Sequence, residues 1–320
     1  MCTRVLWQAD GQPVLVGRNM DWKQTLHTNL WVLPRGAQRS GAAEADPNPL
    51  RWTARYGSVA ALAYDQASTD GINEAGLGAQ LLWLAESDFG PREPHRPGLS
   101  AALWAQYLLD TCATVAEAVA ATEGYQVLGQ NDPHAGTFST VHLVLDDAGG
   151  DSAVIEILAG RPVIHHGPQY TVVTNSPPFE EQLEHQRQFA GLGGDRPLPG
   201  GTAPEDRFVR AAYYLARLPR PETPAEGYAS LLSVLRNAAQ PAGTPDPERP
   251  NVSMTRWRTL ADLTNRIYAF ESSFRPDIVW TTLDAVDFDH CARLDLTQPG
   301  LVGDVTTLYR PAAEPDFQLA

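Results

Sequence analysis

Short β-prone runs separated by turn signals fill most of this 320-residue sequence, and only two blocks have helical periodicity. Many short strands joined by turns are typical of large antiparallel sheets. Between the opening segment and the second helical block, the expected strands are Leu30–Pro34, Ser58–Tyr64, Leu77–Leu84, Thr137–Leu145, Ala153–Leu158, Pro162–His166 and Tyr170–Thr174.

The helical blocks set the order in which sheets and helices alternate. The first covers Leu99–Leu109 and Val115–Ala121, where Thr114 and Glu117 have the spacing of a capping box. The second covers Glu205–Leu218 and Ala225–Ala239. Strands resume after Pro250, and the expected ones include Arg266–Glu271 and Ile278–Thr282.

This order predicts an α+β layered fold rather than βαβ alternation. The Gly/Pro-rich stretches Gly191–Pro204 and Pro241–Pro250 are expected to be loops, and neither is long enough to indicate a domain boundary. We therefore expect residues 1–320 to form a single domain without internal repeats.

Composition limits the possible partners. The formal net charge is −14 and no Lys/Arg cluster occurs, which argues against nucleic acid or an anionic membrane surface as partner and favours a small molecule. No apolar run approaches the roughly 18 to 20 residues that span a bilayer. As written the chain is expected to be cytoplasmic, or periplasmic or secreted if a signal peptide before Cys2 was removed and a Met added. The three widely spaced cysteines indicate neither a disulfide framework nor a zinc site, and no metal or cofactor is expected.

The opening segment predicts a β-hairpin. Thr3–Trp7 and Pro13–Arg18 are β-prone, and Asp10-Gly11 between them is a strong turn signal. Cys2 then begins one strand, while Arg18 and Asp21 lie at or just past the end of the other. Antiparallel pairing is expected to bring these three residues close together.

A cysteine at position two is chemically special because Met1 is readily removed when the next side chain is small. Cys2 would then carry a free α-amino group, with a pKa of about 8, which can act as the base for its own thiol. Arg18 would favour the thiolate, and Asp21 could hold the α-amino group. The alternative is a disordered chain start followed by ordinary solvated charges.

Five strings, in order along the chain, resemble the choloylglycine hydrolase family, which contains penicillin V acylases and conjugated bile salt hydrolases. The first joins Cys2-Thr3-Arg4 to Gly17–Trp22. The others are Gly71–Gly78, Val173–Phe179, Asp206–Arg210 and Ala261–Tyr268. The resemblance implies an N-terminal nucleophile amidase with a four-layer αββα fold, two antiparallel sheets between helix layers. Relatives are often tetramers, so a homo-oligomer is possible.

The resemblance also implies roles for individual residues. Cys2 matches the nucleophile, Arg18 and Asp21 its hairpin partners, Asn175 an oxyanion-stabilising side chain, and Arg207 an active-site arginine. Asn175 follows a β-prone run and precedes Ser-Pro-Pro, where a rigidly held amide or an ordinary turn residue would each fit.

The second oxyanion donor of the family is a backbone N–H, and counting from Gly76-Leu77-Gly78 places Trp83 there. Trp22 and Trp83 would form large apolar walls of an acyl pocket, unless both are plain core residues. Such a pocket resembles the penicillin V acylase branch that also cleaves N-acyl-homoserine lactones.

The sequence therefore predicts hydrolysis of a linear amide to a carboxylic acid and a free amine. Penicillin V-like compounds or N-acyl-homoserine lactones are the leading substrates. The alternatives are conjugated bile salts, fatty acyl amides, or a catalytically idle homologue that binds acyl ligands.

Overall fold

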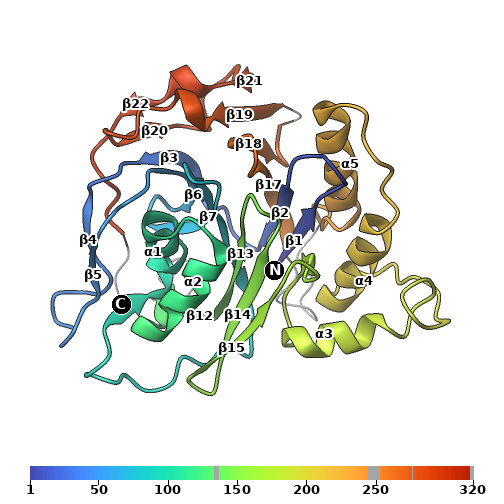
Figure 1. The fold of residues 1–320 in the computed structure, drawn as a ribbon, viewed down its shortest axis with the longest axis horizontal. Coiled ribbons are helices and arrows are strands. Elements are labelled where there is room, and N and C mark those ends of the chain that lie inside the picture. The colour runs from blue at the N-terminus through green and yellow to red at the C-terminus, as the bar shows by residue number, and fades with distance from the viewer. Residues whose placement is uncertain (133–136, 244–252, 276, 318–320) are drawn as a thin grey trace.

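The computed structural model describes residues 1–132, 137–243, 253–275 and 277–317. Two large sheets face each other in the middle, with α1 (Trp104–Thr111) and α2 (Val115–Ala121) outside one sheet and α4 (Pro204–Leu215) and α5 (Pro224–Asn237) outside the other (Figure 1). This arrangement agrees with the predicted four-layer αββα fold.

The seven-stranded sheet carries the N-terminal hairpin near its centre. Its strand order is β16-β1-β2-β17-β18-β19-β21, and neighbours are antiparallel except the parallel pair β19 and β21. The strands are β1 (Cys2–Trp7), β2 (Leu15–Trp22), β16 (Val172–Val173), β17 (Met254–Asp262), β18 (Ile267–Ser272), β19 (Ile278–Thr282) and β21 (Gly303–Asp304).

The nine-stranded sheet has the order β15-β14-β13-β8-β7-β6-β3-β20-β22 and is antiparallel throughout. Its strands are β3 (Asn29–Leu33), β6 (Ser58–Ala63), β7 (Ala67–Asn73), β8 (Gly78–Trp83), β13 (Val141–Asp146), β14 (Ser152–Leu158), β15 (Arg161–His166), β20 (Ala292–Leu294) and β22 (Arg310–Pro311). Smaller pairs are β4 (Gln38–Ser40) with β5 (Arg51–Thr53), β9 (Gly98–Ser100) with β10 (Gln126–Leu128), and β11 (Gln130–Asp132) with β12 (Thr137–Ser139).

Helices α1, α2, α4 and α5 cover the outer faces of the sheets, and α3 (Phe179–Gln186) packs on α4. Short 3-10 turns are η1 (Ala101–Leu103), η2 (Thr122–Gly124), η3 (Leu283–Ala285) and η4 (Thr306–Leu308). Helix α1 packs on β7 and β8, and α2 packs on β13 and β14. On the other side, α4 and α5 pack on β1 and β2. Because both faces of the central strands are covered, β6 is buried along its whole length instead of alternating.

The caps of α2 and α5 explain where these helices begin. The Thr114 hydroxyl accepts the backbone N–H of Glu117 at 3.2 Å, as the capping-box spacing predicts. The Glu117 carboxylate, however, accepts from the N–H of Ala113 rather than from that of Thr114. Thr223 caps α5 in the same manner through the N–H of Glu226.

Two elements near the site are not predicted from the sequence. Strand β7 has no apolar alternation because the buried residues Ser68, Asp70 and Asn73 are polar and have partners inside the protein. Helix α3 is short, follows two prolines, and its N-cap Pro178 makes no side-chain capping bond.

Candidate active site

The N-terminal hairpin has the predicted strands and a turn at Asp10-Gly11, with Gly11 at φ +68°. Its second strand is longer than expected. Arg18 and Asp21 lie inside β2 rather than at or beyond its end, because pairing with β17 continues to Trp22. Cys2 stands opposite Met20 in the register.

Strand alternation sends the side chains of β2 to two different places. Arg18, Met20 and Trp22 line a pocket between the sheets that also contains Cys2. Asp21 faces the other way, toward Arg207 on α4 and Gln240, which follows the end of α5. One strand thus supplies both the pocket side and the helix side of the site.

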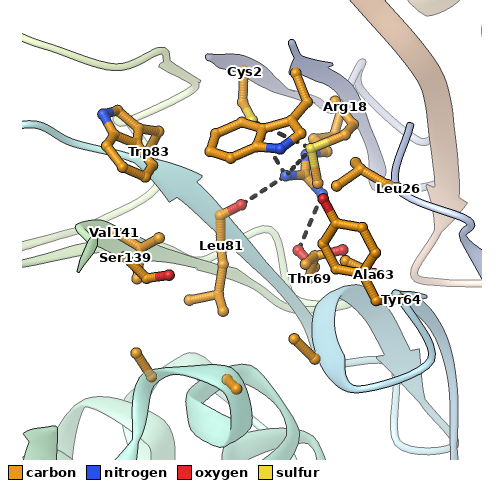
Figure 2. A pocket seen from close by; sticks show the side chains of 15 residues that line it. Cys2, Arg18, Leu26, Ala63, Tyr64, Thr69, Leu81, Trp83, Ser139 and Val141 are labelled. Atoms are coloured by element: carbon orange, nitrogen blue, oxygen red, sulfur yellow. Dashed lines mark hydrogen bonds between the residues drawn. The ribbon is translucent and has the colours of Figure 1, made fainter. Parts of the chain in front are cut away.

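The Cys2 thiol is buried and lies against a fixed cation. Arg18 Nη2 donates to Cys2 Sγ at 3.3 Å (Figure 2). Burial opposes ionisation of the thiol, but the Arg18 guanidinium and the N-terminal ammonium favour the thiolate, so the pKa of Cys2 lies below its usual value. A lowered thiol pKa is the property that a cysteine nucleophile requires.

Arg18 is held in place from both sheets. Its Nη2 also donates to the Leu81 carbonyl at 2.7 Å, and its Nη1 donates to the Thr69 carbonyl at 3.0 Å. The pairing of β6 with β7 shifts at Ala61/Leu62, so Thr69 is the extra residue of a β-bulge, which directs main-chain groups away from the ladder. The Trp257 ring lies 4.9 Å from the guanidinium carbon.

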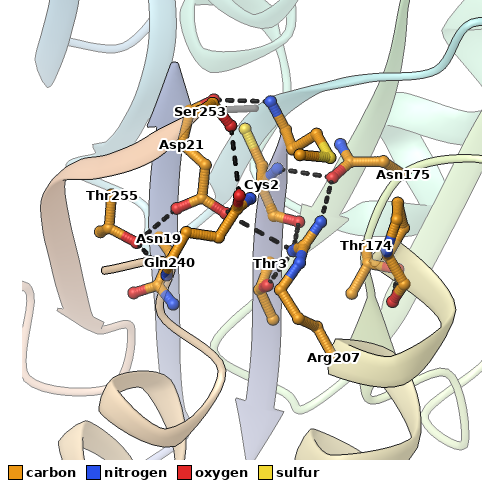
Figure 3. A network of polar contacts seen from close by, with 12 residues as sticks. Cys2, Thr3, Asn19, Asp21, Thr174, Asn175, Arg207, Gln240, Ser253 and Thr255 are labelled. Carbon is orange, nitrogen blue, oxygen red and sulfur yellow. Dashed lines mark hydrogen bonds and ion pairs between the residues drawn. The ribbon is translucent and has the colours of Figure 1, made fainter. Parts of the chain in front are cut away.

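The Asp21 carboxylate is fully paired. It accepts from the Thr255 hydroxyl at 2.6 Å and from the Gln240 amide at 3.0 Å, and lies 3.5 Å from Arg207 Nη1 (Figure 3). A second bulge, between Thr255 and Trp257 in β17, stands opposite Asp21 and Met20. One bulge therefore lies in β17, the strand paired with the second hairpin strand, and the other lies in the nine-stranded sheet that faces Arg18.

Asn175 is oriented by two donors. Its Oδ1 accepts the backbone N–H of Cys2 at 2.6 Å and Nη2 of Arg207 at 2.8 Å (Figure 3). Its Nδ2 therefore points the other way and donates to the Trp83 carbonyl at 2.7 Å. Asn175 is thus adjacent to Trp83, and Trp83 lines the pocket that also contains Cys2.

Arg207 sits in the first turn of α4, an unfavourable end for a cation, and is fully buried. Burial lowers the pKa of its guanidinium, against the charges of Asp21 and Cys2. Its Nη1 donates to the Cys2 carbonyl and to the Thr3 hydroxyl, both at 2.6 Å. Arg207 therefore ties the start of β1 to both Asp21 and Asn175.

Sequence reasoning missed the residues that support this cluster. Thr255 and Gln240 hold Asp21, and Gln182 of α3 donates to the carbonyls of Asn175 and Pro177. Asp70 lies behind Arg18, with 3.6 Å between Oδ2 and Nη1. Of these residues, only Asp70 lies next to a sequence feature that could have pointed to it, because it directly precedes the family-like string Gly71–Gly78.

The pocket beside Cys2 is apolar and has a volume of about 770 Å³, part of which is open to solvent. The Trp22 and Trp83 rings form one wall, with centroids 5.4 Å apart and planes tilted by 51°. The other lining residues are Leu26, Ala63, Tyr64, Ala67, Thr69, Leu81, Ala101, Ala102, Ser139 and Val141 (Figure 2). Both tryptophans therefore stand at a cavity rather than in the closed core.

Met1 is joined to the backbone nitrogen of Cys2 by a peptide bond, so this nitrogen is not a free amine. Its ammonium donates to the main-chain carbonyl of Asp21 at 2.6 Å, not to the carboxylate. Burial lowers the pKa of this ammonium, while the charges of Cys2 and Asp21 act in the opposite direction. The nitrogen of Cys2 is here an amide and serves as a hydrogen-bond donor.

The comparisons with known proteins decide the family. Residues 2–298 match the choloylglycine hydrolase family of linear amide C–N hydrolases. The chain belongs to this family. It is 40% identical to a penicillin V acylase of Pectobacterium atrosepticum, over 100% of this chain and 90% of that protein.

Solved structures of this family agree. A penicillin V acylase from Agrobacterium tumefaciens is 42% identical, covers 100% of both chains and superposes with a TM-score of 0.90. A C2A mutant of a conjugated bile acid hydrolase from Clostridium perfringens is 18% identical, has a TM-score of 0.78, and covers 95% of this chain and 98% of its own.

These matches confirm three predictions: the family, the N-terminal nucleophile hydrolase fold, and an enzyme that hydrolyses C–N bonds in linear amides. In the described part of the chain, no three or more His, Cys, Asp or Glu side chains are grouped so that they could hold a metal ion. None of the helices described is long and apolar enough to cross a bilayer.

Proposed function

We propose that this choloylglycine hydrolase-family member cleaves the side-chain amide of penicillin V-like compounds and the amide of N-acyl-homoserine lactones, so that quorum quenching is among its activities. The observation that carries the proposal is the pocket next to Cys2 Sγ, where the tilted rings of Trp22 and Trp83 form an apolar wall. Aromatic rings and alkyl chains bury well against such surfaces. The similarity to two penicillin V acylases supports the same substrate class.

Removal of Met1 is the first step that we propose. It would turn the Cys2 nitrogen, now 2.6 Å from Asn175 Oδ1, into a free amine beside its own thiol. That amine accepts the thiol proton, and Arg18 at 3.3 Å stabilises the resulting thiolate. Asp21 and Arg207 hold the start of β1 in position.

Acylation follows from attack of Cys2 Sγ on the amide carbon. Charge then develops on the carbonyl oxygen, and we assign its stabilisation to Asn175 Nδ2 and the backbone N–H of Trp83. In the free enzyme Asn175 Nδ2 donates to the Trp83 carbonyl, so this donor is already held next to a residue that lines the pocket.

Collapse of the tetrahedral intermediate breaks the C–N bond and forms a thioester at Cys2. The Cys2 ammonium gives its proton to the departing amine. The neutral amine then takes a proton from water, which attacks the thioester carbon and releases the carboxylic acid and the thiolate.

The first prediction concerns the substrate. Turnover is measured on phenoxyacetyl, phenylacetyl, N-acyl-homoserine lactone, fatty acyl and glycocholate amides, for wild type and for Cys2→Ala, with intact mass recorded for both. We expect fast release from phenoxyacetyl and lactone substrates, a wild-type mass without Met1, and no turnover by the folded variant, because only Cys2 supplies the nucleophile.

Fast glycocholate cleavage without penicillin V or lactone activity would make the chain a bile salt hydrolase, and preference for fatty acyl amides would make it a fatty acyl amidase. An active preparation that retains Met1 would overturn the self-based mechanism. Acyl-ligand binding without turnover of any amide would make the protein a catalytically idle homologue.

A further inference from the structure

Asp70, on β7, lies behind Arg18 and has no role in the mechanism above. Its Oδ2 is 3.6 Å from Arg18 Nη1, and both side chains are at most 2% exposed. Tyr268 of β18, also buried, donates its hydroxyl to Asp70 Oδ1 at 2.5 Å. Asp70, Arg18 and Cys2 Sγ therefore form a row of buried charges: carboxylate, guanidinium and thiolate.

A buried cation needs a counter-charge, because removing an ion from water without a partner is strongly unfavourable. Among the described residues, Asp70 is the one carboxylate that pairs with Arg18 within 4 Å. The Leu81 and Thr69 carbonyls that also accept from Arg18 are neutral. Arg18 thus has two anionic neighbours: Asp70, which belongs to the fold, and the Cys2 thiolate, which the reaction consumes.

We propose that Asp70 is a positioning residue that acts through Arg18: it pairs with the guanidinium whenever Cys2 is uncharged, and it limits how strongly Arg18 favours the thiolate. The proposal rests on Cys2 being the nucleophile of the proposed function. When the Cys2 sulfur forms a bond to an acyl or alkyl carbon it loses its negative charge, and Arg18 then keeps only Asp70 as counter-ion.

The charges around Asp70, Arg18 and Cys2 determine the direction in which Asp70 shifts the ionisation of the Cys2 thiol. Besides Arg18, the N-terminal ammonium and Asp21 act on the pKa of Cys2, and Arg207 pairs with Asp21 and donates to the Cys2 main-chain carbonyl. Burial raises the pKa of Asp70 to about 6, while Arg18 and hydrogen bonds from Tyr268 and Thr259 oppose the rise. A neutral side chain at position 70 would leave the thiolate as the counter-ion of Arg18, which favours ionisation of Cys2.

The test uses the full chain and no amide substrate. Alkylation of Cys2 by iodoacetamide is followed from pH 5 to pH 10, by mass spectrometry of the N-terminal peptide so that Cys112 and Cys291 do not contribute. We expect Asp70→Asn to move the midpoint of the pH-rate profile down by about one unit. Tyr268→Phe, which removes the hydroxyl that stabilises the Asp70 carboxylate, should move it in the same direction by less.

A second readout separates positioning from general destabilisation. Alkylation of Cys2 should lower Tm more in Asp70→Asn than in wild type, because the modified variant leaves Arg18 without an anionic neighbour. Asp146→Asn is the matched control: Asp146 is equally buried and pairs with Arg4 at 2.6 Å, away from Cys2. It should shift neither the alkylation midpoint nor the Tm loss on alkylation.

An unchanged or raised midpoint in Asp70→Asn, with the wild-type Tm loss on alkylation, would overturn the proposal. If Asp70→Asn does not fold, the midpoint of Tyr268→Phe decides. Failure to hydrolyse penicillin V or a lactone would refute the proposed substrates and leave this result untouched, since the alkylation needs only a reactive Cys2.

Discussion

Arg18 is buried and places a fixed positive charge next to the Cys2 thiol. Its guanidinium donates to two main-chain carbonyls of the nine-stranded sheet and keeps one nitrogen against Cys2 Sγ. Carbonyl acceptors orient the cation without cancelling its charge. The thiol therefore faces a fixed positive charge inside the protein, where the effective dielectric constant is lower than in water.

This leads to a prediction for Arg18→Gln, which removes the charge and leaves a shorter, neutral amide donor. The cation lowers the pKa of Cys2 in the wild type, so its loss should move the alkylation midpoint up by about one unit or more and lower kcat/KM at neutral pH. Iodoacetamide profiles and penicillin V turnover measure the two effects. Arg35→Gln, whose side chain is 46% exposed, is the control and should leave both unchanged; a lower midpoint in Arg18→Gln would contradict the electrostatic role.

At the scale of elements, the sequence predicts those whose signals are local. Asp10-Gly11 marks the hairpin, and the apolar spacing of α4 and α5 places their buried faces. The seven predicted site residues lie together around this hairpin, although their catalytic roles remain predictions. Gln240 and Thr255 could not be predicted, because their contacts with Asp21 join residues more than 200 positions apart.

Helix α3 also lacks a local signal, yet it holds Asn175. Gln182 of α3 donates to the Asn175 and Pro177 carbonyls and accepts from the Thr174 hydroxyl. These hydrogen bonds hold the main chain at Asn175 in place, and the position of the proposed oxyanion donor, Asn175 Nδ2, depends on that main chain. The Ser176–Pro177 peptide within this turn is cis.

Gln182→Ala should therefore lower kcat by about 10- to 100-fold, because a donor displaced by a fraction of an ångström stabilises the oxyanion less well. The alkylation rate of Cys2 should stay close to that of the wild type, since Gln182 contacts neither Cys2 nor Arg18. Glu184→Ala, an exposed position of the same helix, is the control. A loss of alkylation equal to the loss of kcat would mean that the helix supports the whole site rather than Asn175.

At the scale of the molecule, two buried ion pairs join the sheets that enclose the pocket. Arg4 on β1 and Arg18 on β2 belong to the seven-stranded sheet, and their partners Asp146 on β13 and Asp70 on β7 belong to the other. All four side chains are at most 2% exposed. Apolar side chains from both sheets pack around these pairs. The pairs therefore fix the position of one sheet relative to the other, at a cost in desolvation.

That cost makes stability depend on pH in a defined direction. Burial raises the pKa of Asp146 from 3.8 to about 6, against the Arg4 charge and a hydrogen bond from Ser152. The folded chain therefore takes up a proton near pH 6 and the unfolded chain only near pH 4, so this group adds stability as the pH falls from 6 to 4. A shift of about two units corresponds to roughly 3 kcal/mol.

Asp146→Asn removes this titration and leaves the other acidic groups in place, including Asp70, so their contributions cancel in a comparison. Between pH 7 and pH 4, the free energy of unfolding of the wild type should rise relative to that of the variant by up to about 3 kcal/mol. Urea unfolding of both proteins at several pH values measures the difference. The prediction fails if the free energy of unfolding of the wild type, relative to that of the variant, stays constant or falls as the pH is lowered. The folded Asp146 carboxyl would then keep its charge, and the desolvation cost of its pair with Arg4 would be far smaller than its burial indicates.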